Sequence, residues 1–145
     1  MYSKILKKLS QTSALTFSPV SQEKLVKMRK SLVQNKFSPL PLDYIKFLQE
    51  TDGLLWNGIR FFGIEEHDRP QKSYTFPNIL KVNQDFAKRN RPADFLILGD
   101  KDEDLLVYDN KQNVYLLVDK MDLISDLSLP RFFDVLYLLT QDFVG

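Results

Sequence analysis

The sequence predicts a single α+β domain, residues 1–145, in which an antiparallel sheet of about four to six strands packs against helices. Three apolar segments, 95–98, 105–108 and 114–118, follow one another with short loops between them. Short loops favour antiparallel hairpins, because a parallel crossover needs about a dozen residues. Elsewhere, apolar residues recur at helical spacing. With 145 residues, 43% of them hydrophobic, the chain is long enough for one continuous core.

Two helices are expected in the N-terminal part. The first covers residues 2–11. The second begins after Ser21, a residue type that favours the N-cap because its hydroxyl accepts a backbone N–H. The apolar stripes that predict them are Ile5, Leu6 and Leu9 in the first helix and Leu25, Met28 and Leu32 in the second.

Residues 40–54 carry the clearest local pattern. Pro41 suits the first turn of a helix, where a missing N–H costs nothing. Tyr44, Phe47, Leu48 and Thr51 would share one face of that helix. Gly53 is expected to end it in the left-handed conformation that glycine adopts without penalty.

An aromatic-rich hairpin is predicted directly after this helix. Asn57-Gly58 is the residue pair that two-residue hairpin turns prefer, and the following strand contains Phe61 and Phe62. Trp56 lies between two apolar segments, so we expect it to be buried as a core residue.

The second half of the chain is expected to begin with a polar loop, residues 65–77. Asn78 would cap a helix that runs to about Arg89, and the three strands follow. Residues 123–129 are interpreted as a transition, and Pro130 as the first turn of a last helix. The apolar stripe of that helix is Phe132, Leu136, Leu139 and Phe143.

The net charge of +1 hides an asymmetry. Residues 1–48 hold nine Lys/Arg and two Asp/Glu, net +7, whereas residues 49–145 hold eleven and seventeen, net −6. A basic half is compatible with nucleic acid or an acidic partner. The favoured interpretation is a solvated helix face formed by Lys24, Lys27 and Lys30, because charge runs usually lie on such faces.

The sequence predicts a soluble, cytoplasmic protein. Lys4, Lys7 and Lys8 interrupt the first apolar stretch, so no signal-peptide core is present. No segment approaches the roughly 20 apolar residues that a membrane span needs. The absence of cysteine fits a reducing compartment and excludes disulfides and thiolate metal sites.

No motif for catalysis, a cofactor or a metal is found, and we expect none of the three. His67 is the only histidine, and its polar neighbours predict a surface position. Glycine-rich phosphate loops are absent. Asp100, Asp102 and Asp104 copy the first ligands of a calcium loop, but Leu105 and Lys111 occupy the positions that need Gly and Glu.

The central pattern resembles the signature of the SUKH superfamily, the Smi/Knr-like domains, and the YrhA-like branch is the most similar. The match is tightest over residues 38–63 and extends more loosely to the C-terminal helix. The matching residues are Leu40-Pro41, Asp43-Tyr44, Phe47-Leu48 and Asp52-Gly53, with Gly99-Asp100 and 106–109 beyond them. The family's motif residues are expected to build the fold rather than perform chemistry.

The resemblance implies a non-catalytic protein-binding module, as many bacterial members are immunity proteins that neutralise a cognate toxin, often a nuclease. An acidic surface would then meet a basic toxin. The candidate residues are Glu65, Glu66, Asp68, Asp100, Asp102, Glu103 and Asp104. For residues 100–104 alone, the favoured interpretation is a plain solvated hairpin turn, because a charged turn needs no function to explain it. For the whole chain, the alternatives are a regulatory scaffold for an endogenous partner or, less favoured, a nucleic-acid-binding or small enzymatic domain.

Overall fold

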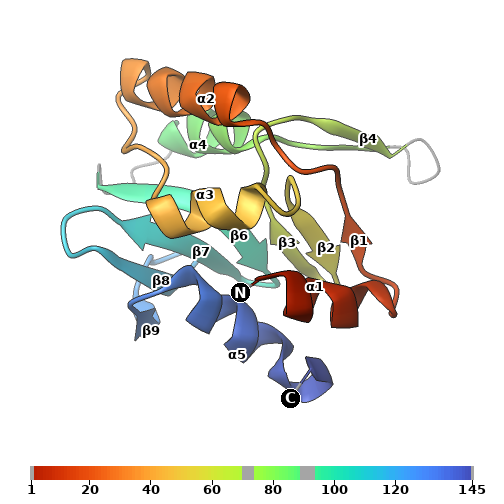
Figure 1. Cartoon of the computed structure of the whole chain (residues 1–145). Coiled ribbons are helices and arrows are strands. Elements are labelled where there is room, and N and C mark those ends of the chain that lie inside the picture. The colour runs from red at the N-terminus through yellow and green to blue at the C-terminus, as the bar shows by residue number, and fades with distance from the viewer. Residues whose placement is uncertain (1, 70–73, 89–93, 145) are drawn as a thin grey trace.

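The computed structural model describes residues 2–69, 74–88 and 94–144. Within these residues the chain forms five helices and nine strands (Figure 1). The helices are α1 (Tyr2–Ser10), α2 (Gln22–Gln34), α3 (Leu42–Leu48), α4 (Ile79–Ala87) and α5 (Phe132–Val144). The strands are β1 (Leu15–Thr16), β2 (Leu54–Trp56), β3 (Ile59–Phe61), β4 (His67–Arg69), β5 (Tyr74–Phe76), β6 (Phe95–Lys101), β7 (Asp104–Asp109), β8 (Val114–Asp119) and β9 (Ser125–Leu129).

Seven of these strands form one antiparallel sheet in the order β1-β2-β3-β6-β7-β8-β9. The remaining two, β4 and β5, pair with each other. The predicted α+β class, with an antiparallel sheet packed against helices, is therefore confirmed. The sheet has seven strands where about four to six were expected. Residues 125–129 pair with β8 as an edge strand instead of forming a transition, and residues 15–16 add a short strand beside β2 at the other edge.

The centre of the sheet is buried on both faces. Leu105 pairs with Val118 on one face, and the two are 2% and 0% exposed. Leu106 and Tyr115 belong to the other alternating set, and each is 1% exposed. The continuous apolar runs of these strands are explained by this two-sided burial.

An aromatic cluster joins α3, α5 and the sheet. The ring of Phe132 lies 4.7 Å from Tyr44, 4.9 Å from Phe47, 5.2 Å from Phe61 and 5.9 Å from Tyr115, measured between ring centroids. All five side chains are nearly or fully buried. Large aromatic rings supply most of the core's contact area at this point.

The two predicted N-caps are confirmed. The Ser21 hydroxyl accepts from the N–H of Lys24 at 3.3 Å, and the Asn78 side chain accepts from the N–H of Lys81 at 2.8 Å. The helix that Asn78 begins ends at Ala87, and Arg89, its predicted limit, lies outside the described residues. α2 and α4 pack side by side (Figure 1).

The predicted end of the central helix is wrong. Pro41 is the N-cap of α3, and the helix ends at Leu48, well before Gly53. The reason is tertiary: the Thr51 hydroxyl accepts from the N–H of Phe17, and the N–H of Asp52 donates to the carbonyl of Ser18. These bonds draw the chain out of the helix, and Gly53, with φ of +105°, leads into β2.

The predicted Asn57-Gly58 turn is confirmed. Its two residues have φ of 48° and 81°, as a type I′ turn requires, and they connect β2 to β3. Trp56 packs against the core but remains partly exposed. It lies beyond the end of β1, which pairs only with Leu54 and Leu55.

The predicted polar loop is a two-stranded hairpin in its described part. His67 pairs with Phe76 and Asp68 with Thr75. Phe76 is fully buried and anchors the hairpin, with its ring 5.7 Å from both Phe17 and Phe62. A single buried aromatic residue in a polar stretch is too weak a pattern to predict strands.

Candidate functional site

Asp52 forms a buried hydrogen-bond centre after α3. Its Oδ1 accepts from the N–H of Ile64 at 2.7 Å, and its Oδ2 accepts from the N–H of Glu65 at 3.1 Å. Burial raises the pKa of Asp52, and the two N–H donors and His67 oppose this rise. Gly63 is required beside it, because a Cβ there would lie 2.2 Å from Oδ1.

His67 completes this centre. Its Nε2 lies 2.9 Å from Oδ2 of Asp52, and its ring stacks on Phe17 with 4.0 Å between centroids. The predicted surface position is wrong, since only a fifth of the side chain is exposed. Side chains alternate along β4, so His67 faces inward while Asp68 faces solvent.

Asp43 connects three distant elements. Its Oδ2 accepts from the N–H of Phe132 at 2.7 Å and so caps α5, and its Oδ1 accepts from the hydroxyl of Tyr115. The Asp43 carbonyl accepts from the hydroxyl of Tyr2 at 3.1 Å. A carboxylate at a helix N-terminus is stabilised by the free N–H groups there.

Tyr44 fixes the sheet from inside the core. Its hydroxyl donates to the carbonyl of Phe62 at 2.5 Å and lies 3.2 Å from that of Leu98. Burial raises the pKa of Tyr44 well above its ordinary value. Asp43, Tyr44, Asp52 and His67 therefore serve the fold: each satisfies buried backbone or hydroxyl groups.

The seven predicted acidic residues lie in two separate groups. The two groups lie at opposite ends of β3. At its first residue, Ile59, the strand pairs with Lys101. After its last residue the chain continues to Phe62, whose N–H donates to the carbonyl of Leu98. Four of the acids lie near the first residue of β3, in the β6–β7 hairpin: Asp100, Asp102, Glu103 and Asp104. The other three come after the last residue of β3: Glu65, Glu66 and Asp68. The structure therefore does not bring all seven acids together.

The group beyond β3 is exposed and partly paired. Glu65 accepts from Nζ of Lys24 at 2.7 Å, and Asp68 accepts from the hydroxyl of Thr75 at 3.0 Å. Glu66 is exposed as well. These side chains are accessible, but the Lys24 ammonium offsets part of their charge.

Asp100 differs from the other predicted acids because it is buried. Arg60 holds it with two bonds, Nε to Oδ1 at 2.8 Å and Nη2 to Oδ2 at 2.5 Å. Lys120 Nζ lies 3.9 Å from Oδ2. This bidentate pair ties β3 to β6 and neutralises the carboxylate within the chain.

Asp102 and Glu103 are exposed at the turn between β6 and β7, and Asp104 is half-buried. Asp102 has φ of 53°, which suits a tight turn. The turn between β2 and β3 lies beside it: a Cβ at Gly58 would be 3.7 Å from Asp102 Oδ1. The two carboxylates at the turn point away from the core and have no cation of the described residues bonded to them.

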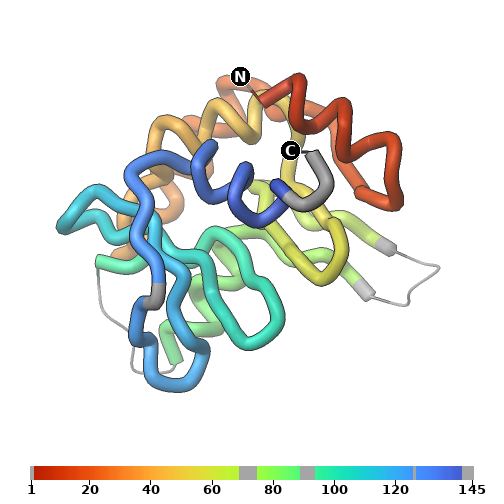
Figure 2. Tube along the Cα trace, turned by 90° about the horizontal axis from the view of Figure 1, so that it is seen from below, coloured from red at the N-terminus to blue at the C-terminus, as the bar shows by residue number. Residues whose placement is uncertain are grey.

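A second turn, between β8 and β9, lies against the first, as Figure 2 shows. The N–H of Lys120 donates to the carbonyl of Glu103 at 2.9 Å. Asp119 accepts from the N–H of Met121 at 2.7 Å, and Asp122 accepts from that of Ile124 at 2.8 Å. These bonds hold Met121 and Ile124 in solvent, 88% and 64% exposed.

Sequence reasoning missed this turn, although a signal was present. Asp119 and Asp122 are each followed two residues later by a backbone N–H that they bond, which is typical of Asx turns. We call the exposed side chains Asp102, Glu103, Met121, Asp122 and Ile124 the acidic tip.

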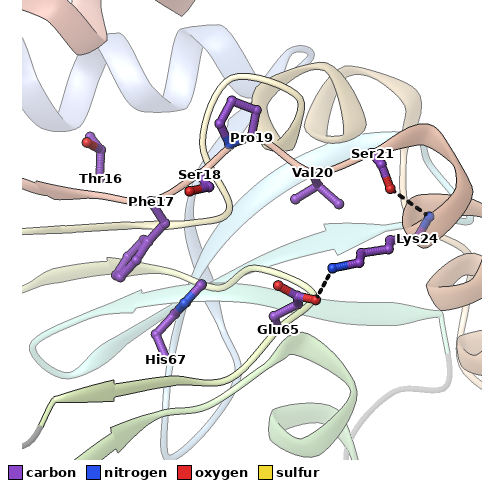
Figure 3. A pocket seen from close by; sticks show the side chains of 9 residues that line it. All are labelled: Thr16, Phe17, Ser18, Pro19, Val20, Ser21, Lys24, Glu65 and His67. Atoms are coloured by element: carbon purple, nitrogen blue, oxygen red, sulfur yellow. Dashed lines mark hydrogen bonds and ion pairs between the residues drawn. The ribbon is translucent and has the colours of Figure 1, made fainter.

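A cleft of about 810 Å³ lies elsewhere, between the N-terminus of α2 and the β4–β5 hairpin (Figure 3). The charged pair Lys24–Glu65 closes one side, and the stacked rings of Phe17 and His67 form the other. It is lined by residues 16–21, Lys24, Glu65 and His67. Its charged groups are bonded to one another or to Asp52.

Among the described residues, no group of three or more His, Cys, Asp or Glu side chains is placed to hold a metal ion. None of the helices in the described ranges combines the length and the apolar character that a membrane crossing needs.

A scan of protein-family models gives no match to this chain, and a search of curated proteins gives none either. The SUKH resemblance therefore stays a prediction.

Proposed function

We propose that the chain is a non-catalytic protein-binding module that binds a basic protein through the acidic tip. In its specific form the proposal is an immunity protein that neutralises a cognate bacterial toxin, often a nuclease, in the cytoplasm. The SUKH resemblance supports this form, and the properties of the acidic tip support the binding role.

The observation that carries the proposal is the combination of charge and apolar surface at the tip. The acidic tip exposes three carboxylates, those of Asp102, Glu103 and Asp122. Met121 and Ile124 stand among these charges on a hydrogen-bonded turn. Exposed apolar side chains with a charged rim are typical of protein-binding sites.

The charged and the apolar side chains of the acidic tip would contribute to binding in different ways. The carboxylates raise the rate of encounter with a basic partner and select against acidic proteins. Met121 and Ile124 would enter apolar pockets of the partner and slow dissociation. The turn already holds them in place, so little conformational entropy is lost on binding.

The non-catalytic part of the proposal is supported by the roles of the polar residues. Asp43, Tyr44, Asp52 and His67 are buried or half-buried polar residues of the types that often act as catalysts. Each is bonded to the backbone or a side chain of another element. Removing any of them is expected to damage the fold first.

The test is a pull-down of the tagged chain from its native cell, eluted in a salt gradient and analysed by mass spectrometry. We expect one stoichiometric basic partner that leaves at moderate salt. Asp102→Asn with Glu103→Gln should slow association about tenfold at low salt. Met121→Ser with Ile124→Ser should speed dissociation by about tenfold or more.

Glu66→Gln with Asp68→Asn is the matched control, because it removes two exposed acids from the other predicted group. It should leave both rates nearly unchanged. If the tip variants bind as the wild type does, with the same salt dependence, the tip is not the binding surface. If the control alone loses binding, the group beyond β3 is the site.

Two other functions are separated by the same experiment. An endogenous partner without toxin features, and no toxin gene beside that of this chain, would favour a regulatory scaffold. Recovery of nucleic acid alone, with binding that falls steeply as salt is added, would favour a nucleic-acid-binding domain.

A further inference from the structure

A second apolar surface lies on the outer side of α2. The helix buries Leu25, Met28 and Leu32, but Val26 and Val33 are 42% and 53% exposed. Residues seven apart lie on the same helix face, so the two valines form a separate stripe about 10 Å long. A helix held in the fold by its other face does not need this stripe for packing.

The chain after α2 turns back and forms the opposite wall. Lys36 has φ of 69°, its N–H donates to Val33, and the N–H of Phe37 donates to Leu32. This is a Schellman motif, which fixes the direction of the chain after the helix. Pro39 is thereby placed beside the valines, and the groove between them has a volume of about 520 Å³.

The rim of the groove is basic. Residues 22–36 hold five Lys/Arg and one Glu. Lys24 is paired with Glu65, and Lys27 lies 3.6 Å from Glu23. Arg29 and Lys30 line the groove, and neither forms an ion pair with a described residue.

We propose that this groove, formed by Val26, Arg29, Lys30, Val33, Gln34 and Pro39, binds an acidic segment of another protein that carries an apolar face. The apolar side chains would lie against Val26, Val33 and Pro39, and carboxylates would pair with Arg29 and Lys30. Apolar residues spaced i, i+7 in a helix match the stripe's length and share one helix face, as the two valines do.

Charge complementarity selects this occupant. Arg29 and Lys30 repel a basic segment. Phosphate groups would bind these cations by charge alone and would make no use of the apolar contact that the valines offer. The groove is separate from the acidic tip, and the acidic tip would bind basic partners instead. The inference therefore does not depend on the proposed function, and each can fail alone.

The test uses the full chain and a display library of random linear peptides. Selected peptides should be rich in Asp and Glu and carry apolar residues at the stated spacing. Their affinity should fall about tenfold or more in Val26→Ser with Val33→Ser. It should fall about fivefold in Arg29→Gln with Lys30→Gln, and this loss should shrink as salt is added.

The matched control is Lys4→Gln with Lys7→Gln, which removes two exposed cations from α1 instead. It should bind the peptides as the wild type does, and all variants should keep the wild-type Tm. Selected peptides without acidic residues, or with affinity that survives the valine changes, would overturn the proposal. The proposal would also be overturned if the valine variant bound duplex DNA or phosphatidylserine vesicles as strongly as the wild type does. It would be overturned as well if the wild type associated with itself and the valine changes abolished this association.

Discussion

Lys36 holds a backbone conformation that lysine adopts at a cost. Its φ of 69° lies in the left-handed region, where the Cβ of an L-residue crowds the carbonyl oxygen. The Schellman bonds at the end of α2 impose this conformation. Glycine adopts it freely and is the residue usually found at this position.

Lys36→Gly is therefore expected to stabilise the protein by about 0.5–1 kcal/mol, measured by urea unfolding, since the relief of strain exceeds the added entropy of the unfolded chain. Asn57→Gly, at φ of 48°, is the comparison and should gain less, because asparagine tolerates this region better. A loss of stability in Lys36→Gly would show that the lysine side chain contributes contacts that outweigh the strain.

Single residues also show where sequence reasoning succeeds. Ser21 and Asn78 cap their helices as predicted, and Asn57-Gly58 forms the predicted turn, because each bonds within a few residues of itself. Asp52 and His67 are fifteen residues apart, and no local pattern joins them. The position of His67 could not be predicted for that reason.

Among the elements, α5 begins at a cap that comes from a residue distant in the sequence. The N–H of Phe132 is capped by Asp43, 89 residues earlier. The same carboxylate accepts from the Tyr115 hydroxyl of β8. α3 thereby sets where the last helix begins and how it meets the sheet.

Asp43→Ala should destabilise the protein by about 2–4 kcal/mol, because α5 loses its cap and the buried Tyr115 hydroxyl loses its acceptor. The loss of stability in Asp43→Asn should lie between that of Asp43→Ala and zero, since one acceptor oxygen remains. Thermal and urea unfolding measure both effects.

Asp134→Asn is the matched control. Asp134 lies in the first turn of the same helix and pairs with Arg131 on the surface at 2.7 Å. The loss should stay below about 1 kcal/mol, as is usual for exposed ion pairs. Equal losses at Asp43 and Asp134 would contradict the role assigned to Asp43.

The element pattern also marks a limit of prediction. Strands β6, β7 and β8 were predictable from their apolar runs, whereas β9 has only two apolar residues, Leu127 and Leu129, among its five. That pattern is too short to separate an edge strand from a loop. The β8–β9 turn, and with it Met121 and Ile124 of the acidic tip, could not be located without β9.

For the molecule as a whole, buried tyrosines govern the response to alkali. Burial raises the pKa of Tyr2, Tyr44 and Tyr115 above the ordinary value of 10.0. The folded state therefore holds these protons while the unfolded state releases them. Their contribution to stability is complete below about pH 10 and is lost as the pH rises above it.

We expect the free energy of unfolding to fall above pH 10, by about 2.7 kcal/mol per pH unit from Tyr44 and Tyr115 together. Urea unfolding at a series of pH values measures this slope. Tyrosinate absorbance from these residues should appear together with the loss of circular dichroism. Ionisation near pH 10 without unfolding would contradict their burial.

Tyr44→Phe separates the titration from the packing. The variant should be less stable at pH 7, because the carbonyls of Phe62 and Leu98 lose a donor. Above pH 10 its slope should be smaller by about 1.4 kcal/mol per pH unit, since one fewer proton is released on unfolding.

Tyr2 packs against Phe132 and Phe133, with ring centroids 6.0 Å and 5.8 Å apart. During synthesis, α1 leaves the ribosome before α5, and its partners in α5 follow about 130 residues later. At the usual rate of translation this delay is roughly 7 to 25 seconds. α1 has to stay soluble through that time with its apolar side uncovered, and Lys4, Lys7 and Lys8 give the nascent helix the charge to do so.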